Sequence, residues 1–219
     1  MPGPLPPNCT TDAMLSSAKS TYCASYCVER DQFRGVAGKG GWHDPDMLLV
    51  GQTNCSAQAQ KNGMHCGALS HDEEQLQMAI WSMSAAPLLM STDVAAISAT
   101  SKAILLNPGV IAINQDPLGR MPFRYSIDAA TGVHLWRKEL VGGGVAVAIV
   151  NYNDAGSIAA GLTINLLDTG FSTDTRVSVA DVFEEKALGW HTFTFTTTRA
   201  IPSHGVMLLK LAYSPQYEL

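Results

Sequence analysis

The residue pattern of this chain changes near residue 120, and this change limits the possible folds more than any other feature. Before residue 120, segments with helical spacing alternate with short apolar runs; after it, only short runs rich in β-branched and aromatic residues follow. Alternating strands and helices are typical of β/α units, whereas closely spaced short strands are typical of an antiparallel sandwich. The sequence therefore predicts an irregular, cysteine-containing segment at 1–30, an α/β part at 31–120 and an all-β domain at 121–219.

The α/β part contains one strong helix signal. Ser70 and Glu73 fit a capping box, in which the hydroxyl accepts from the Glu73 amide and the carboxylate accepts from the Ser70 amide. We expect the buried face of this helix to consist of the apolar residues at helical spacing, namely Leu76, Ala79, Ile80 and Met83. Glu74 and Gln77 are expected on its outer face.

Three further elements are predicted before the transition. Residues 86–90 are apolar throughout, which favours a strand covered on both faces. Ser98 can cap a second helix that runs through Leu106 and ends at the Asn-Pro-Gly that follows, and residues 110–114 can add one more turn. A strand followed by a helix is the order of a β/α unit.

The all-β part begins with a hairpin signal. Residues 133–140 and 145–152 are rich in β-forming side chains, and glycines that accept positive φ lie between them. Further strands are expected at 162–166, 176–182, 191–197 and 206–212.

Composition and charge exclude several classes of protein. With 46% hydrophobic and 15% charged residues, the chain can bury a globular core. The net charge of −5 and the lack of a basic run argue against a nucleic-acid partner. The longest apolar runs are far shorter than the ~20 residues of a membrane helix, so no membrane span is predicted. Residues 1–7 have neither the basic start nor the apolar run of a signal peptide.

The first 66 residues hold all five cysteines and both Asn-x-Ser/Thr motifs. Asn8 and Asn54 are therefore candidate glycosylation sites. Cys55 and Cys66 flank a polar stretch that a disulfide could close. The alternative is a zinc site that combines a Cys-x3-Cys pair with nearby histidines, at Cys23, Cys27, His65, Cys66 and His71. Because zinc sites usually show two tight ligand pairs and only one is present here, we predict no metal.

The segment Gly38–Leu48 is the most specific motif. Its glycines permit a tight reversal, Pro45 holds its neighbour extended, and Asp44 and Asp46 present carboxylates at alternate positions. The residues alone also fit a capped loop that leads into a helix.

Residues 40–48, Gly-Gly-Trp-His-Asp-Pro-Asp-Met-Leu, closely resemble a segment of glycoside hydrolase family 27, the α-galactosidases and α-N-acetylgalactosaminidases. Three later blocks are similar to that family in the same order, at 77–88, 91–93 and 110–119. Four ordered blocks are far more specific than one. The resemblance implies the last two β/α units of a (β/α)8 TIM barrel followed by an antiparallel β-sandwich, which is the carboxy-terminal half of such an enzyme. An incomplete barrel leaves strand edges unpaired, so association with the missing barrel half or with a second copy is expected.

The resemblance also implies a retaining mechanism, in which one carboxylate attacks the anomeric carbon and another acts as acid and then base. The family's nucleophile lies in a Lys-x-Asp-x-Cys-type strand, and this sequence contains no such segment. Asp12 lies near the spacing of the family's acid/base, but Asn8 occupies the position of its arginine, so Asp12 is a weak candidate against a simple loop aspartate. We therefore expect the chain alone to be inactive.

Sugar recognition is what the resemblance carries over residue by residue. Asp46 matches the aspartate that hydrogen-bonds galactose, and Met47 matches the methionine that lines the same pocket. Trp42 and Asp44 match positions that support the loop, and His43 replaces the usual asparagine. A carboxylate can accept from two hydroxyls, and a thioether gives an adaptable apolar wall.

Two classes of function therefore stay open. The first is a portion of an active α-galactosidase, and the second is a noncatalytic relative that binds galactosides or a partner protein. The resemblance implies α-galactoside sugars as ligands, no cofactor, and a secreted, lysosomal or vacuolar location. It does not separate galactose from N-acetylgalactosamine.

Overall fold

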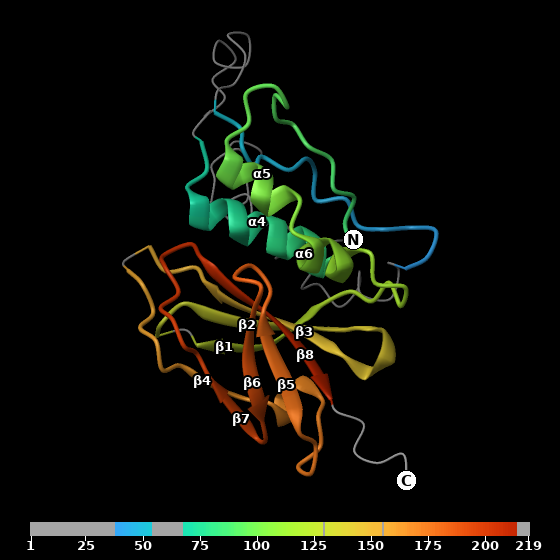
Figure 1. The fold of residues 1–219 in the computed structure, drawn as a ribbon, viewed down its shortest axis with the longest axis vertical. Coiled ribbons are helices and arrows are strands. Elements are labelled where there is room, and N and C mark those ends of the chain that lie inside the picture. The colour runs from blue at the N-terminus through green and yellow to red at the C-terminus, as the bar shows by residue number, and fades with distance from the viewer. Residues whose placement is uncertain (1–37, 54–67, 129, 155, 214–219) are drawn as a thin grey trace, which may run out of the picture.

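A computed structural model describes residues 38–53, 68–128, 130–154 and 156–213. Three helices, α4 (His71–Met83), α5 (Ala99–Leu105) and α6 (Pro108–Asn114), lie on one side of a six-stranded antiparallel sheet. A two-stranded sheet lies further from the helices. Figure 1 therefore shows the helices at the top, the large sheet below them and the small sheet at the bottom. The predicted combination of a partial barrel and a β-sandwich is confirmed.

Helices α4 and α5 begin where the capping residues predict, whereas α6 begins at Pro108, before the turn expected at 110–114. Ser70 Oγ accepts from the Glu73 amide at 3.3 Å, and Glu73 Oε2 accepts from the Ser70 amide at 2.8 Å, which completes the capping box of α4. Ser98 caps α5, and Asn107 caps α6, which has Pro108 in its first turn. The Asn-Pro-Gly segment therefore ends one helix and begins the next.

The apolar face predicted for α4 is confirmed, because Leu76, Ala79, Ile80 and Met83 are all buried. The prediction that Glu74 and Gln77 face outward is wrong, since these side chains are only 6% and 0% exposed. The reason is that α4 is enclosed on several sides. It contacts α5 and α6, the strands β3 (Val145–Asn151) and β8 (Val206–Tyr213) of the large sheet, and the turn at residues 49–51.

The strand predicted at 86–90 is reduced to one parallel bridge between Leu48 and Met90. The Leu48 amide donates to the Leu89 carbonyl at 2.7 Å, and the Ser91 amide donates to the Leu48 carbonyl at 3.0 Å. The expectation that both faces are covered is wrong, because Leu89 and Met90 are 52% and 40% exposed. Parallel pairing of two segments on either side of a helix is the connection of a β/α unit.

The large sheet has the strand order β1-β2-β3-β8-β5-β6 and the small one pairs β4 with β7. The strands are β1 (Phe123–Asp128), β2 (Val133–Glu139), β3 (Val145–Asn151), β4 (Thr163–Asn165), β5 (Val177–Asp181), β6 (Lys186–His191), β7 (Thr194–Thr196) and β8 (Val206–Tyr213). Short 3₁₀ turns, η2 (Val141–Gly143) and η3 (Leu167–Thr169), follow β2 and β4. The hairpin of β2 and β3 is confirmed.

The strand predicted at 191–197 is wrong as a single element. The chain leaves β6 at His191 and begins β7 at Thr194, which joins the other sheet. Phe193 lies between them with φ of +65°, a left-handed conformation that reverses the chain. The strand β6 was not predicted, because it is mostly exposed and shows no clean apolar alternation.

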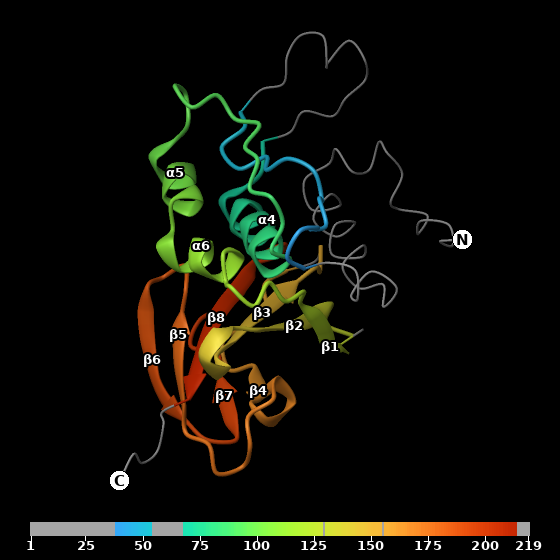
Figure 2. The same cartoon turned by 90° about the vertical axis from the view of Figure 1, so that its right-hand side faces the viewer.

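The large sheet separates two hydrophobic clusters. On β3, Ala146 and Ala148 face the helices, whereas Val147 and Ile149 face the small sheet. This alternation follows from the two-residue repeat of a strand. Figure 2 shows the two layers from the side, with α4 and α6 above the large sheet and β4 and β7 below it.

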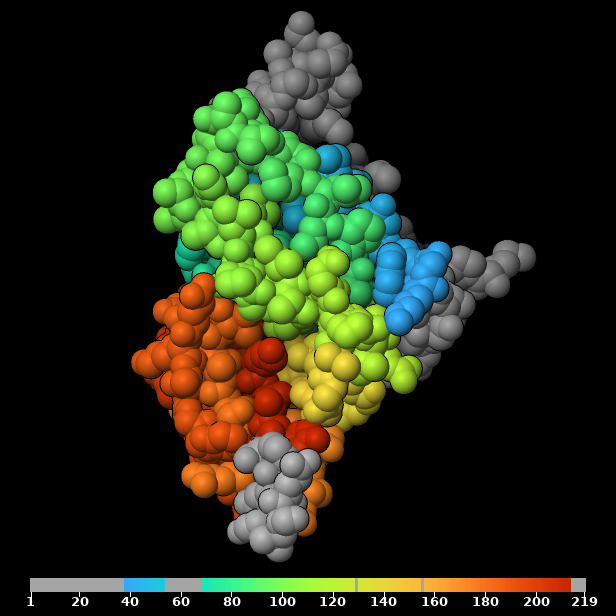
Figure 3. Space-filling model, turned by 45° about the vertical axis from the view of Figure 1, so that its right-hand side comes forward, coloured from blue at the N-terminus to red at the C-terminus, as the bar shows by residue number. Residues whose placement is uncertain are grey.

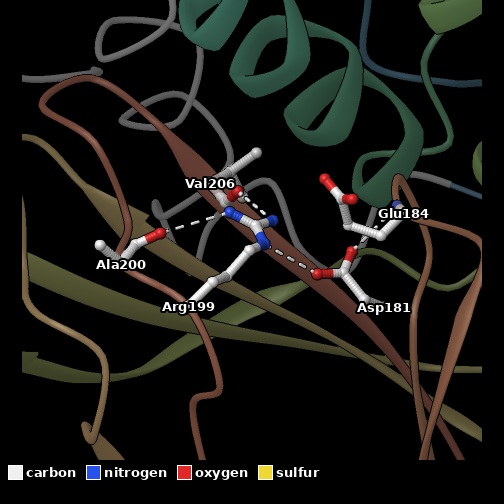
Figure 4. A network of polar contacts seen from close by, with 5 residues as sticks. All are labelled: Asp181, Glu184, Arg199, Ala200 and Val206. Carbon is white, nitrogen blue, oxygen red and sulfur yellow. Dashed lines mark hydrogen bonds and ion pairs between the residues drawn. The ribbon is translucent and has the colours of Figure 1, made fainter.

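A buried ion pair fixes the end of β5. Asp181, which is 2% exposed, accepts from Arg199 Nε at 3.0 Å through Oδ2 (Figure 4). Arg199 Nη2 also donates to the Val206 carbonyl at 3.3 Å, and the Glu184 amide donates to Asp181 Oδ1 at 3.4 Å. The arginine therefore joins β5 to the start of β8, and the Asp181 carboxylate supports the turn that leaves β5.

Candidate functional site

The motif at residues 44–47 forms an exposed turn directly before Leu48. The Asp46 amide donates to Asp44 Oδ1 at 3.0 Å, and the Met47 amide donates to Asp46 Oδ1 at 2.7 Å. Asp46 has φ of +78°, a conformation in which aspartate is enriched among non-glycine residues. Upstream, Gly38 and Gly41 exchange backbone hydrogen bonds, which confirms the predicted tight reversal.

The backbone of Asp46 is held at both ends. Asp44 accepts from its amide, and Trp81 Nε1 on α4 donates to its carbonyl at 2.8 Å. The side chain of Asp46 remains exposed. A carboxylate has about four acceptor sites, so the bond from the Met47 amide leaves capacity for hydroxyl groups. The turn therefore presents a fixed carboxylate at the surface.

Exposed apolar side chains lie on the motif and on the segment that pairs with it. Met47 follows Asp46 directly and is 43% exposed, and Leu89 and Met90 lie on the segment that pairs with Leu48. A carboxylate next to apolar side chains matches the two faces of a sugar, whose hydroxyls need acceptors and whose ring carbons need apolar contact.

The two residues predicted to support the loop have different contacts. Asp44 bonds the Asp46 amide, as described above. The ring of Trp42 lies against Gly119, where an added Cβ would come within 2.5 Å of Trp42 Cη2. Figure 3 shows the segment at 38–53, in blue, at the surface beside the light green residues that follow α6. Trp42 therefore connects the glycine-rich part of the motif to the turn at 116–119, rather than to Asp46.

A cavity of about 350 Å³ lies beside Trp42, lined by Lys39, Trp42, Ala85, Ala86, Pro87, Asn114, Gln115, Asp116 and Pro117. Its lining includes neither Asp46 nor Met47, so the cavity differs in position from the sugar site that the motif indicates. Asn114 and Asp116, two of its polar side chains, are already engaged. Asn114 Nδ2 donates to the Ala86 carbonyl at 2.9 Å, and the two carboxylate oxygens of Asp116 accept from the amides of Leu118 and Val141 at 3.0 Å each. We therefore place the candidate site at Asp46.

Several predicted residues cannot be placed. Asp12, Asn8, Asn54, Cys55 and Cys66 lie outside the described residues, so those predictions stay open. Within the described ranges, no group of three His, Cys, Asp or Glu side chains is arranged to hold a metal ion. In the same part of the chain, no helix is both long and apolar enough to cross a membrane.

Comparison with known proteins decides the family. A family model described as alpha galactosidase A matches residues 12–116, and one described as the alpha galactosidase C-terminal beta sandwich domain matches residues 130–211. The chain belongs to glycoside hydrolase family 27. The family 27 chain is 33% identical over 186 residues to human alpha-galactosidase A, an alignment that covers 84% of the chain and 40% of that enzyme. It is also 33% identical over 163 residues to alpha-N-acetylgalactosaminidase of Gallus gallus, covering 74% and 36% of the two chains.

Solved structures agree with this assignment. The structure of alpha-galactosidase I from Mortierella vinacea superposes on the chain with a TM-score of 0.74 at 26% sequence identity. The match covers 100% of this chain and 51% of the Mortierella chain. A family 27 β-L-arabinopyranosidase from Geobacillus stearothermophilus shares the fold, with a TM-score of 0.73 at 18% sequence identity. That match covers 92% of this chain and 42% of the arabinopyranosidase chain. The chain thus spans about half or less of the length of these relatives, and it matches their carboxy-terminal half.

Proposed function

We propose that this chain supplies the galactose-recognising carboxy-terminal portion of an α-galactosidase-type glycoside hydrolase. The observation that carries the proposal is the turn at Asp46, whose backbone is fixed by Asp44 and Trp81 while its carboxylate is exposed next to Met47. Asp46 accepts hydrogen bonds from hydroxyls of a terminal α-galactose, and Met47 contacts the sugar ring. Similarity to α-galactosidases and α-N-acetylgalactosaminidases supports this assignment.

Hydrolysis by these 219 residues alone is not part of the proposal. A retaining glycosidase needs two carboxylates about 5 Å apart, one of them a nucleophile. The sequence contains no Lys-x-Asp-x-Cys segment to supply the nucleophile of the family. We therefore propose that the chain binds galactosides without turning them over, and that turnover requires further barrel strands, whether these belong to the same gene product or to a partner.

The test is a paired measurement of binding and hydrolysis on the purified chain. We expect methyl α-galactoside to bind in a titration followed by NMR, and a chromogenic α-galactoside to be hydrolysed no faster than in buffer. The same titration with N-acetylgalactosamine compares the two sugars of the related enzymes. Hydrolysis that survives purification and disappears in Asp12→Asn would contradict the inactivity and would make Asp12 the acid/base.

A further inference from the structure

Three polar side chains on one side of α4 hold the backbone that carries Asp46. Trp81 Nε1 donates to the Asp46 carbonyl at 2.8 Å. The Leu49 amide donates to Gln77 Oε1 at 2.8 Å, and the Gly51 amide donates to Glu74 Oε1 at 2.7 Å. We call Glu74, Gln77 and Trp81 the α4 clamp.

The spacing of the α4 clamp follows from helix geometry. Positions 74, 77 and 81 are three and four residues apart, so they lie on the same face of α4. Trp81 lies seven positions after Glu74, which is about 10 Å along the helix axis. The contacts run in the opposite order along the segment, from residue 46 through 49 to 51. The segment therefore lies antiparallel to α4, and each clamp residue bonds a different point of it.

Burial shows that the clamp is more than a chance set of contacts. Glu74, Gln77 and Trp81 are all buried, although an acidic and an amide side chain are costly to enclose and Gln77 Nε2 has no hydrogen-bond partner among the described residues. Glu74 also accepts from Ser101 Oγ, at 3.0 Å and 2.8 Å through its two oxygens. Glu74 therefore connects Gly51 to α5 and is itself held in place. An apolar side chain at 74 or 77 would fill the space but could not accept from the segment's amides.

The conformation of Asp46 explains why such a clamp is needed. A residue other than glycine with φ near +78° is held in a sparsely populated region, at a cost of order 1 kcal/mol, and persists only where its surroundings over-determine it. The Asp44 carboxylate fixes the amide of Asp46, and the Trp81 indole fixes its carbonyl. Gln77 and Glu74 then fix the chain that follows.

We infer that Glu74, Gln77 and Trp81 are positioning residues that set the direction in which Asp46 presents its carboxylate to a galactoside. This inference rests on the proposed function of Asp46. Helix α4 thereby contributes to sugar affinity without touching the sugar. The competing interpretation is that the three side chains stabilise the fold and nothing more.

The experiment separates affinity from stability in the full chain. Trp81→Phe removes the indole donor together with part of the buried ring, and Gln77→Met removes the acceptor at similar volume. Glu74→Gln keeps an acceptor for the Gly51 amide and serves as the conservative variant. Val110→Ala is the control, because Val110 is a fully buried residue of α6 in the same hydrophobic cluster. For each protein we would measure Tm, and the Kd for methyl α-galactoside at a temperature where circular dichroism shows it fully folded.

We expect Trp81→Phe and Gln77→Met to raise Kd roughly 5- to 30-fold, the loss that follows from one hydrogen bond to the motif. Glu74→Gln should stay within about twofold of the wild type, and Val110→Ala should lower Tm with no change in Kd. If Trp81→Phe and Gln77→Met lower Tm as the control does and leave Kd unchanged, the positioning role is wrong.

Amide hydrogen exchange distinguishes failure of this inference from failure of the proposed function. The Leu49 amide should exchange slowly in the wild type and faster in Gln77→Met, and the Gly51 amide should stay protected in Glu74→Gln. A wild type that does not bind galactosides would overturn the proposed function and the role in recognition together. Unchanged Leu49 protection in Gln77→Met would overturn the α4 clamp itself, whatever the sugar affinity.

Discussion

Lys138 Nζ donates to the carbonyl of Ile113 at 2.7 Å, across the boundary between the sheet and the helices. The same ammonium donates to the Ser82 carbonyl at 3.1 Å. These carbonyls lie in the last turns of α6 and α4, where backbone acceptors lack partners within the helix. Lys138 belongs to β2 and is fully buried. One side chain of the sheet therefore satisfies the ends of two helices and joins the two parts of the chain.

The first prediction concerns stability at alkaline pH. Burial lowers the pKa of Lys138 to about 8, while Asp116 acts in the opposite direction. An unfolded lysine titrates near 10.5, so between pH 8 and 10.5 the unfolded chain binds more protons at this residue than the folded one. The contribution of Lys138 to the free energy of unfolding should therefore rise with pH across this window, by up to about 3 kcal/mol.

The measurement is urea unfolding from pH 7.5 to 10 for the wild type and Lys138→Met, which removes the titration but keeps the stem. The difference between the two proteins cancels the titration of other lysines and tyrosines. A wild type that loses stability relative to Lys138→Met as pH rises would contradict the depressed pKa.

The second prediction concerns stability at acidic pH. Burial lowers the pKa of His134 to about 4, and the charge of Arg124 acts in the same direction. Arg124 Nη1 lies 3.2 Å from His134 Nδ1, and the imidazole packs edge-on against Tyr152. Because the folded chain resists protonation at His134, stability should fall as pH drops from 6.5 towards 4. Over this range the free energy of unfolding of His134→Phe should fall by about 1 to 3 kcal/mol less than that of the wild type, as measured by denaturant unfolding. Parallel curves for the two proteins would show that His134 is not responsible.

The third prediction concerns the ion pair of Asp181 and Arg199. Arg199→Ala leaves the buried carboxylate without its charged partner and should cost about 3 to 5 kcal/mol of unfolding free energy. The double variant Asp181→Asn with Arg199→Ala removes both charges at the same loss of arginine packing, and it should be more stable than Arg199→Ala alone. A double variant no better than Arg199→Ala would mean that lost packing, rather than the unpaired charge, dominates.

The fourth prediction uses two glycines as a matched pair. Gly119 and Gly142 both have positive φ, at +59° and +73°, but only Gly119 lies against a side chain. An added Cβ at Gly119 would come within 2.5 Å of the Trp42 ring, whereas at Gly142 nothing lies within 4 Å. Gly142→Ala should therefore cost only the backbone strain of about 1 kcal/mol, and Gly119→Ala more. Gly119→Ala should also change the tryptophan fluorescence by displacing Trp42, and equal losses without that change would argue against the contact.

Much of the fold could be predicted because it depends on local chemistry. The capping box at Ser70 and the caps at Ser98 and Asn107 are interactions within three residues, so the sequence shows both partners. The burial of Glu74 and Gln77 could not be predicted, because helical spacing identifies one apolar face and does not reveal that a helix is enclosed on other sides.

The same distinction applies to the candidate site. The role of Asp46 as sugar ligand stays a prediction of the motif, whereas the contact between Asp44 and the Asp46 amide lies within one turn and is visible in the structure. The support from Trp81 could not be predicted, because its bond to the Asp46 carbonyl joins residues 35 positions apart. The one available signal was the recurrence of Glu74, Gln77 and Trp81 on one helix face, which is informative only once the partner of that face is known.

The most direct test of the account is a galactose titration of the wild type, Asp46→Ala and Asp44→Ala. We expect Asp46→Ala to leave sugar hydroxyls unpaired and to raise Kd roughly 30- to 1,000-fold, which corresponds to about 2 to 4 kcal/mol. Asp44→Ala should mainly lower Tm, because Asp44 bonds the turn itself. Galactose should raise the Tm of the wild type and have much less effect on Asp46→Ala. Near-normal galactose binding by Asp46→Ala, with binding lost in Asp44→Ala, would contradict the assignment of Asp46 as the sugar ligand.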